Sequence, residues 1–214
     1  MNKITNYIIS LCVPVISSFE LCASGSQPPN ILLIVAEDAS QDLQCYGNEH
    51  VYTPILDKLA AEGVRFNNAY TTYSVSSPSR GSIFTGLYPH QNGQIGLATH
   101  RYEMFEGIIT LPTYMKHLGY KTGCIGKIHV NPESAIPFDY WEIRSSNFAK
   151  KNLEDYSVKA KEFVTSDNKP YFLMVNFPDA HHPFQKQVEG KPLHLVETGD
   201  VREGLPFVDR KSVV

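Results

Sequence analysis

Apolar residues gather in short segments along the chain, and their spacing predicts an alternation of strands and helices. Residues 30–36 form a continuous apolar run, which is the pattern of a strand buried on both faces of a sheet. We predict further strands over residues 64–70, 120–125 and 171–177, and helices over residues 54–62, 78–85, 110–118 and 155–164. This order predicts an α/β fold with a mainly parallel sheet and helices on both faces. From residue 185 to residue 214 the pattern weakens into loop.

The ends of the predicted helices carry residues that commonly begin or end helices. Thr53 can cap the first helix, and Pro54 takes its first position, where the missing N–H would have no partner in any case. Gly63, Gly86 and Gly119 follow the last residues of three predicted helices, as glycine often does. These signals support the helix assignments.

The first residues have the pattern of a secretory signal. Residues 1–24 carry a single lysine, an apolar run over residues 7–16 and small residues around Ala23. We expect cleavage after residue 23, so that residues 1–23 form a signal peptide. The apolar run is too short for a membrane span. The alternative is an N-terminal anchor.

Charge and cysteine content limit the possible functions. The formal net charge of the 214 residues is −3, and no strongly basic segment points to a nucleic-acid partner. Cys12 and Cys22 lie in the predicted signal, which leaves Cys45 and Cys124, too few for a disulfide framework. An exported protein of this kind indicates a bacterial periplasmic or secreted location.

Polar side chains follow three of the predicted strands. Glu37 and Asp38 come after the first strand, Lys127 and His129 after the third, and His181 after the last. Ligands of α/β sheets bind at the carboxyl ends of the strands, so we expect these residues to lie close together. Adjacent carboxylates suit a hard cation such as calcium or magnesium, a lysine can hold an anion, and a histidine can transfer a proton. Taken singly, each group is better explained by a surface loop or a packed side chain.

A serine-rich stretch, SSPSR, runs from Ser76 to Arg80 and leads into a predicted helix. Serine and proline commonly open helices, so a capped turn is one interpretation. The unpaired N–H groups and the positive dipole end of the helix would also suit an anion, and Arg80 can turn toward the same point. Combined with the strand ends, this stretch predicts a pocket for a tetrahedral oxyanion.

The SSPSR segment, together with the Thr-Gly pair at residues 85–86, resembles the signature of the sulfatase family, a Cys or Ser followed by x-Pro-x-Arg. The acidic pair before this segment, and a Gly-Lys-x-His segment and an Asp-x-His segment after it, stand in family order, so the resemblance extends from residue 30 to about residue 206. It implies the alkaline-phosphatase-like fold of sulfatases. It also implies that a radical sulfatase-maturating enzyme converts Ser76 to formylglycine (3-oxoalanine).

The resemblance further implies calcium as a cofactor and a role for each matching residue. Three residues would bind the metal: Glu37, Asp38 and the modified Ser76. Four would be catalytic, with the modified serine as nucleophile: Ser76, Arg80, Lys127 and His129. His181 would bind the substrate.

Residues 89–93, 126–133 and 177–181 most resemble the heparan N-sulfatase members of the family. This implies a hydrolase that releases sulfate from a sulfated glycosaminoglycan, above all from N-sulfoglucosamine of heparan or heparin fragments. Three alternatives stay open: an O-sulfatase acting on another glycan, a phosphatase or phosphodiesterase of the same superfamily, and a non-catalytic sugar-binding fragment.

Two features depart from the family pattern. Glu37 stands where many sulfatases have aspartate, and its longer side chain changes the reach of the carboxylate. Family members are also much longer than 214 residues. We therefore expect residues 30–214 to be the N-terminal portion of a sulfatase catalytic domain whose C-terminal part, with further calcium ligands, is missing, and we expect this portion to be inactive alone.

Overall fold

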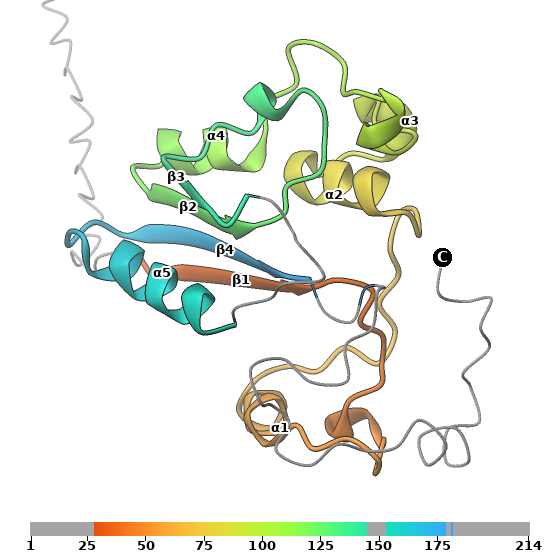
Figure 1. Cartoon of the computed structure of the whole chain (residues 1–214), viewed down its shortest axis with the longest axis vertical. Coiled ribbons are helices and arrows are strands. Elements are labelled where there is room, and N and C mark those ends of the chain that lie inside the picture. Colours follow the sequence, from red (N-terminus) through yellow and green to blue (C-terminus); the bar gives the residue numbers. More distant parts are fainter. Residues whose placement is uncertain (1–27, 145–152, 179–180, 182–214) are drawn as a thin grey trace, which may run out of the picture.

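The computed structural model of the chain describes residues 28–144, 153–178 and 181 (Figure 1). The predicted signal peptide, residues 1–23, lies outside the described residues. So does the weakly patterned segment 185–214. Within the described part, no helix has both the length and the apolar character needed to cross a bilayer.

A four-stranded sheet forms the centre of the molecule. Its strands are β1 (Ile31–Ala36), β2 (Lys121–Gly126), β3 (Tyr140–Glu142) and β4 (Tyr171–Phe177). They lie in the order β1-β4-β2-β3, and each neighbouring pair is parallel. The predicted α/β fold with a parallel sheet is confirmed. Because the strands are parallel, the segments that leave their carboxyl ends all emerge at one edge.

Helices cover both faces of this sheet (Figure 1). The main helices are α1 (Pro54–Glu62), α2 (Ser76–Thr85), α4 (Leu111–His117) and α5 (Leu153–Thr165). Shorter turns of helix are α3 (Pro89–Asn92), η1 (Gln44–Tyr46), η2 (Ala98–His100) and η3 (Glu133–Ala135). Helices α2 and α4 lie on one side of the sheet and α5 lies on the other.

The alternation of side chains along β4 explains the two apolar cores. Phe172 and Met174 face one side of the sheet and pack in a cluster with Phe84 of α2. Leu173 and Val175 face the other side, where they belong to a second cluster that includes side chains of α5. Every one of these four strand residues is at least 95% buried, since their exposed fractions do not exceed 5%. The apolar run of β4 is therefore buried on both faces, as expected of a strand that lies between two others.

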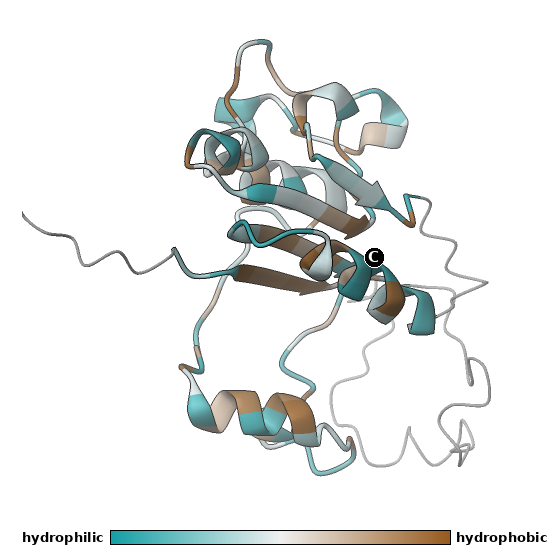
Figure 2. Cartoon of the chain, turned by 90° about the vertical axis from the view of Figure 1, so that its left-hand side faces the viewer, coloured by the Kyte–Doolittle hydropathy of each residue, from teal (hydrophilic) through white to brown (hydrophobic). Residues whose placement is uncertain are grey.

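Two expectations about strands are wrong. Residues 64–70 form no strand, and the side chains of Val64 and Phe66 are 81% and 68% exposed. This segment is held to η1 instead, because the hydroxyl of Tyr46 donates to the carbonyl of Phe66 at 2.9 Å. Strand β1 is also not buried on both faces: Leu32 and Ile34, which point to the same face, are 55% and 54% exposed, because α5 packs against β2 and β4 and leaves this edge strand uncovered in the described part. Figure 2 shows that β1 is nonetheless as hydrophobic as its neighbour.

Helix α2 begins earlier than its sequence suggests. The pattern places the first helical residue at Pro78, whereas the helix starts at Ser76 and ends at Thr85. The N–H of Ser79 donates to the carbonyl of Val75 at 3.0 Å, which closes the first turn. Proline causes no loss there because the first N–H groups of a helix have no partner within it. Ser76 therefore lies at the open, N-terminal end of the helix.

Candidate active site

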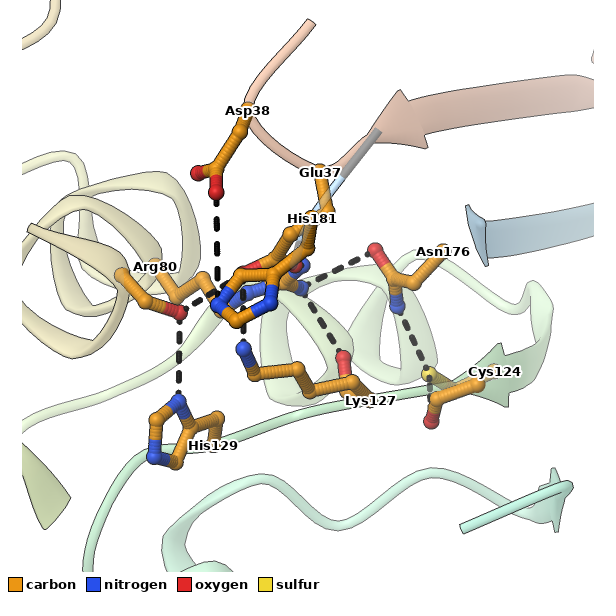
Figure 3. Close-up of polar contacts among 10 residues, drawn as sticks. Glu37, Asp38, Arg80, Cys124, Lys127, His129, Asn176 and His181 are labelled. Atoms are coloured by element: carbon orange, nitrogen blue, oxygen red, sulfur yellow. Dashed lines mark hydrogen bonds and ion pairs between the residues drawn. The ribbon is translucent and has the colours of Figure 1, made fainter. Parts of the chain in front are cut away.

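The predicted polar residues meet at the carboxyl edge of the sheet (Figure 3). Glu37 follows β1, and Lys127 follows β2. Asn176 lies near the end of β4. Helix α2 brings Ser76 and Arg80 to the same place from the side. Four elements that are far apart in the sequence thus contribute to one cluster.

Ser76 contacts two other residues of the cluster. Its hydroxyl donates to Oε1 of Glu37 at 3.0 Å, and its oxygen lies 3.1 Å from Nδ1 of His129. As the first residue of α2, Ser76 also lies beside the unpaired N–H groups and the positive dipole end of that helix. Its side chain is therefore surrounded by an acid, an imidazole and a helix N-terminus, a setting that suits a reacting hydroxyl next to an anion.

The carboxylate of Glu37 is buried between two cations. Lys127 Nζ lies 2.6 Å from Oε1, and the guanidinium of Arg80 binds Oε2. Burial on its own would raise the pKa of Glu37, but the attraction of Arg80 and Lys127 outweighs it and lowers that pKa to about 2. Glu37, which is only 4% exposed, is therefore ionised at neutral pH and holds both cations in place.

Lys127 reaches Glu37 because the chain turns sharply at Gly126. Gly126 has a φ of +97°, and a Cβ atom at this position would overlap the carbonyl oxygen of Asn176. Only glycine can therefore occupy the last position of β2 beside β4. Burial lowers the pKa of Lys127, while its contact with Glu37 acts in the opposite direction.

His129 has an unusual backbone and a neutral side chain. Its φ is +55°, a left-handed conformation that is uncommon for residues other than glycine. Burial, reinforced by the nearby charge of Lys127, lowers the pKa of His129 to about 4. The imidazole is therefore neutral at pH 7, and because the one hydroxyl proton of Ser76 goes to Glu37, the ring nitrogen that faces Ser76 donates to the serine oxygen.

Asp38 and His181 lie next to each other at the rim of the cluster. Nε2 of His181 is 3.9 Å from Oδ2 of Asp38, and their side chains are 34% and 44% exposed. Like His129, Asp38 has a positive φ, +54°. This pair is the most accessible part of the predicted site. The remaining acid and histidine of the sequence motif, Asp179 and His182, lie outside the described residues.

The Thr-Gly pair has a structural role at the end of α2. Gly86 has a φ of +69° and ends the helix, as glycine does in a left-handed cap. The hydroxyl of Thr85 donates to the carbonyl of Gly81 at 2.7 Å and accepts a hydrogen bond from the side chain of Asn92 at 3.2 Å. The pair thereby joins α2 to the following helix α3.

The described arrangement, as it stands, does not fit the calcium ion that the resemblance implies. Glu37, Asp38 and Ser76 carry oxygen donors of the class that calcium prefers. Both oxygens of Glu37, however, already contact a lysine, an arginine or a hydroxyl. Among the described residues, no group of three or more His, Cys, Asp or Glu side chains could hold a metal ion. Calcium at Glu37 would have to displace one of the two cations.

The sequence located most of this cluster but missed two of its members, Asn176 and Cys124. Asn176 accepts a hydrogen bond from Arg80 Nη1 at 3.2 Å and donates one to Sγ of Cys124 at 3.4 Å. The one available sequence signal for Asn176 was its amide in the otherwise apolar run YFLMVNF. Its partner in the sequence could not be identified, because the contact between Asn176 and Arg80 spans 96 positions.

Comparison with known proteins agrees with the sequence motifs. The sulfatase family model matches residues 29–192. Human N-sulphoglucosamine sulphohydrolase is 37% identical over 81% of this chain, and an ulvan-active sulfatase of Formosa agariphila is 34% identical over 83%. The chain spans 35% and 37% of the lengths of these two relatives.

A solved structure shares the fold. BT4656 in complex with its substrate, D-glucosamine-2-N,6-O-disulfate, superimposes with a TM-score of 0.66 and 28% identity, covering 75% of this chain and 36% of that one. The sheet order and the cluster at its carboxyl edge thus occur in a chain whose sequence matches the sulfatase model over most of its length. The chain belongs to the sulfatase family, with the alkaline-phosphatase-like fold of that family.

Proposed function

We propose that the protein carrying this chain is a hydrolase that releases sulfate from sulfated glycans, with position 76 as the reacting centre. The observation that carries the proposal is the location of Ser76 Oγ, 3.0 Å from Glu37 Oε1 and 3.1 Å from His129 Nδ1 at the start of α2. A structural helix cap would have no need of a buried acid and a neutral imidazole on the same hydroxyl.

We further propose that Ser76 is the residue converted to formylglycine by a radical sulfatase-maturating enzyme. The hydrate of that aldehyde would supply an attacking hydroxyl and a second hydroxyl that allows sulfate to leave. Ser76 suits this modification because its side chain faces Glu37 and His129, whereas Ser77 is fully buried and its hydroxyl accepts a hydrogen bond from the N–H of Ala98 at 2.9 Å.

His129 would move the proton at position 76. Its pKa of about 4 keeps the ring neutral at pH 7, so that in the tautomer with no hydrogen on Nδ1 it can take a proton from one hydroxyl of the formylglycine hydrate while the other hydroxyl donates to Glu37. His181, which lies at the accessible rim beside Asp38, would contact the substrate and give a proton to the departing amine or alcohol. His129 and His181 would thus serve the two ends of the bond that breaks.

Lys127 and Arg80 would stabilise negative charge on the sulfuryl oxygens. Both are held next to position 76 by the Glu37 carboxylate, which is largely buried with them. An ammonium group has three N–H donors in a compact head, so Lys127 can contact Glu37 and a sulfuryl oxygen together. Calcium at Glu37 would have to replace one of these two cations, and it would then supply the positive charge in its place.

For the substrate, we propose N-sulfoglucosamine of heparan or heparin fragments. The support is the 37% identity to the human sulphohydrolase and the fold shared with the structure that holds a disulfated glucosamine. Sulfate on another glycan is the second candidate, because the ulvan-active relative is almost equally similar. We also propose export to the periplasm or the outside of the cell, on the pattern of residues 1–23.

The test is sulfate release by the protein that carries this chain, coexpressed with a radical maturase. Substrates would be N-sulfated glucosamine, 6-O-sulfated glucosamine and ulvan fragments. We expect release from N-sulfated glucosamine to require the maturase and to be lost in Ser76→Ala. The matched control is Ser79→Ala, which removes a neighbouring hydroxyl whose hydrogen-bond partner among the described residues is Thr71. Equal release by wild type and Ser76→Ala would refute the proposal.

A further inference from the structure

We propose that Asn176 is a positioning residue that fixes the guanidinium of Arg80 in the active site. This inference rests on the proposed function for its catalytic consequence, whereas its geometric part stands independently. Asn176 belongs to none of the sulfatase motifs in this chain, and it is 1% exposed. Its side chain lies between the guanidinium of Arg80 and the thiol of Cys124 in β2 (Figure 3).

The guanidinium of Arg80 is held by three residues that lie in or just after three parallel strands. Nη2 binds the carboxylate of Glu37, which follows β1. Nη1 donates to the carbonyl of Lys127, just after β2, at 2.9 Å, and to Oδ1 of Asn176, in β4, at 3.2 Å. Nη1 carries two hydrogens, and these two acceptors account for both. Asn176 therefore supplies the neutral side chain of a three-point clamp, whose other two acceptors are a carboxylate and a backbone carbonyl.

The orientation of the Asn176 amide is set by its hydrogen-bond partners, Arg80 and Cys124. Only the oxygen of an amide can accept a hydrogen bond from a guanidinium, so Oδ1 must face Arg80. Nδ2 then faces Cys124, whose sulfur accepts its hydrogen bond at 3.4 Å. The thiol of Cys124 in turn donates to the carbonyl of Gly126 at 3.9 Å. Burial raises the pKa of Cys124 to about 12, which keeps the thiol protonated and able to make that bond.

The clamp connects Asn176 to Ser76 through two intermediate residues, Arg80 and Glu37. Arg80 holds Glu37, and Glu37 accepts the hydrogen bond of Ser76. Loss of the amide oxygen would leave one N–H of a buried guanidinium without an acceptor, and the group would pivot to find another. The carboxylate would move with it, and the hydroxyl at position 76 would lose its alignment. Because Asn176 is too buried to touch substrate, this loss should reduce kcat and spare KM.

The variants that test this are Asn176→Leu, which keeps the size but removes the amide, and Asn176→Asp, which keeps an acceptor for Arg80. We expect Asn176→Leu to lower kcat about 10- to 100-fold with KM within about threefold of wild type. Asn176→Asp should restore most of kcat. Equal losses in the two variants would overturn the proposal, because the acceptor would then not be the property that matters.

Thr122→Val is the matched control for simple destabilisation. Thr122 is fully buried at the other end of the sheet, where its hydroxyl donates to Asp139 at 2.8 Å. This variant should lower the melting temperature as Asn176→Leu does, with kcat unchanged. If Thr122→Val lowers kcat to the same extent, the effect of Asn176 is one of stability and the proposal fails.

A measurement without turnover separates this proposal from the proposed function. In arginine-selectively 15N-labelled chain, Arg80 of the wild type should give separate, slowly exchanging Nη signals, which should merge or broaden in Asn176→Leu. Unchanged Nη signals would overturn the positioning role even if the enzyme is active. Merged signals in a protein that releases no sulfate would refute the proposed function and leave the positioning of Arg80 supported.

Discussion

Oγ of Ser76 lies 3.1 Å from Nδ1 of His129, a residue 53 positions further along the chain. The contact forms because α2 starts at Ser76 beside the sheet edge and because Gly126 turns the segment after β2 toward that helix. Neither residue could make this contact from its local sequence alone. The arrangement of the parallel strands therefore creates the pairing that the proposed chemistry requires.

The low pKa of His129 predicts that the unfolding free energy falls in mild acid. The unfolded chain takes up a proton at this histidine near its ordinary pKa of 6.5, whereas the folded chain does so only near 4. Stability should therefore decrease as the pH falls from 6.5 to 4, because the unfolded state binds more protons in that window. Urea unfolding at pH 7, 5.5 and 4 measures this slope.

His129→Asn is the control for that slope, because it removes the titrating ring. The variant should lose less stability than wild type between pH 6.5 and pH 4. Glu37 acts in a lower window: its pKa is 4.5 ordinarily and about 2 in the fold, so its contribution is lost as the pH falls from 4.5 toward 2. If the slope above pH 4.5 is the same with and without His129, the ring is not buried as described.

Calcium binding should respond in opposite directions to two substitutions. Asp38→Asn removes a charge from the predicted ligand pair and should weaken binding. Lys127→Met removes the ammonium that lies 2.6 Å from Glu37 and should strengthen binding, because calcium then competes with one cation fewer. Calorimetric titration of the two variants and the wild type with calcium chloride measures both effects. A weaker affinity in Lys127→Met would show that the lysine does not occupy the cation position.

Gly126→Ala should destabilise the protein more than a glycine substitution in open space. The new Cβ would overlap the Asn176 carbonyl, so we expect a loss of about 3 kcal/mol, of which backbone strain supplies about 1. Gly47→Ala is the matched control, because Gly47 has nearly the same φ, +95°, with nothing within 4 Å of the added atom. Denaturant unfolding of both variants gives the comparison. Equal losses would mean that β2 and β4 are less closely packed here.

Much of this fold followed from sequence patterns. The four predicted helices and three of the four predicted strands occur. In β4 the apolar spacing matches the packing that the strand makes, whereas the apolar residues of α1 are exposed in the described part of the chain. Strand β3 was not predicted, since Tyr140–Glu142 is too short to have a period and owes its conformation to pairing with β2. Residues 64–70 were predicted as a strand on composition, yet no described strand lies beside them to supply hydrogen bonds.

The site was predictable to the extent that it consists of charged residues at strand ends. The parallel sheet brings together Glu37, Lys127 and His129, as their sequence positions after strands suggested. The clamp on Arg80 could not be predicted, because its acceptors include a backbone carbonyl and a lone amide. Contacts of this kind leave no periodic or compositional signal.

The most direct test of the account is the mass of the tryptic peptide that carries Ser76, after coexpression of this chain with a radical sulfatase-maturating enzyme. We predict a loss of two hydrogens, mapped by fragmentation to Ser76 and absent from Ser74, Ser77 and Ser79. Ser76→Ala should abolish the change, and Ser79→Ala should leave it intact. An unmodified Ser76, or an aldehyde at one of the neighbouring serines, would contradict the central claim that position 76 is the precursor of the nucleophile.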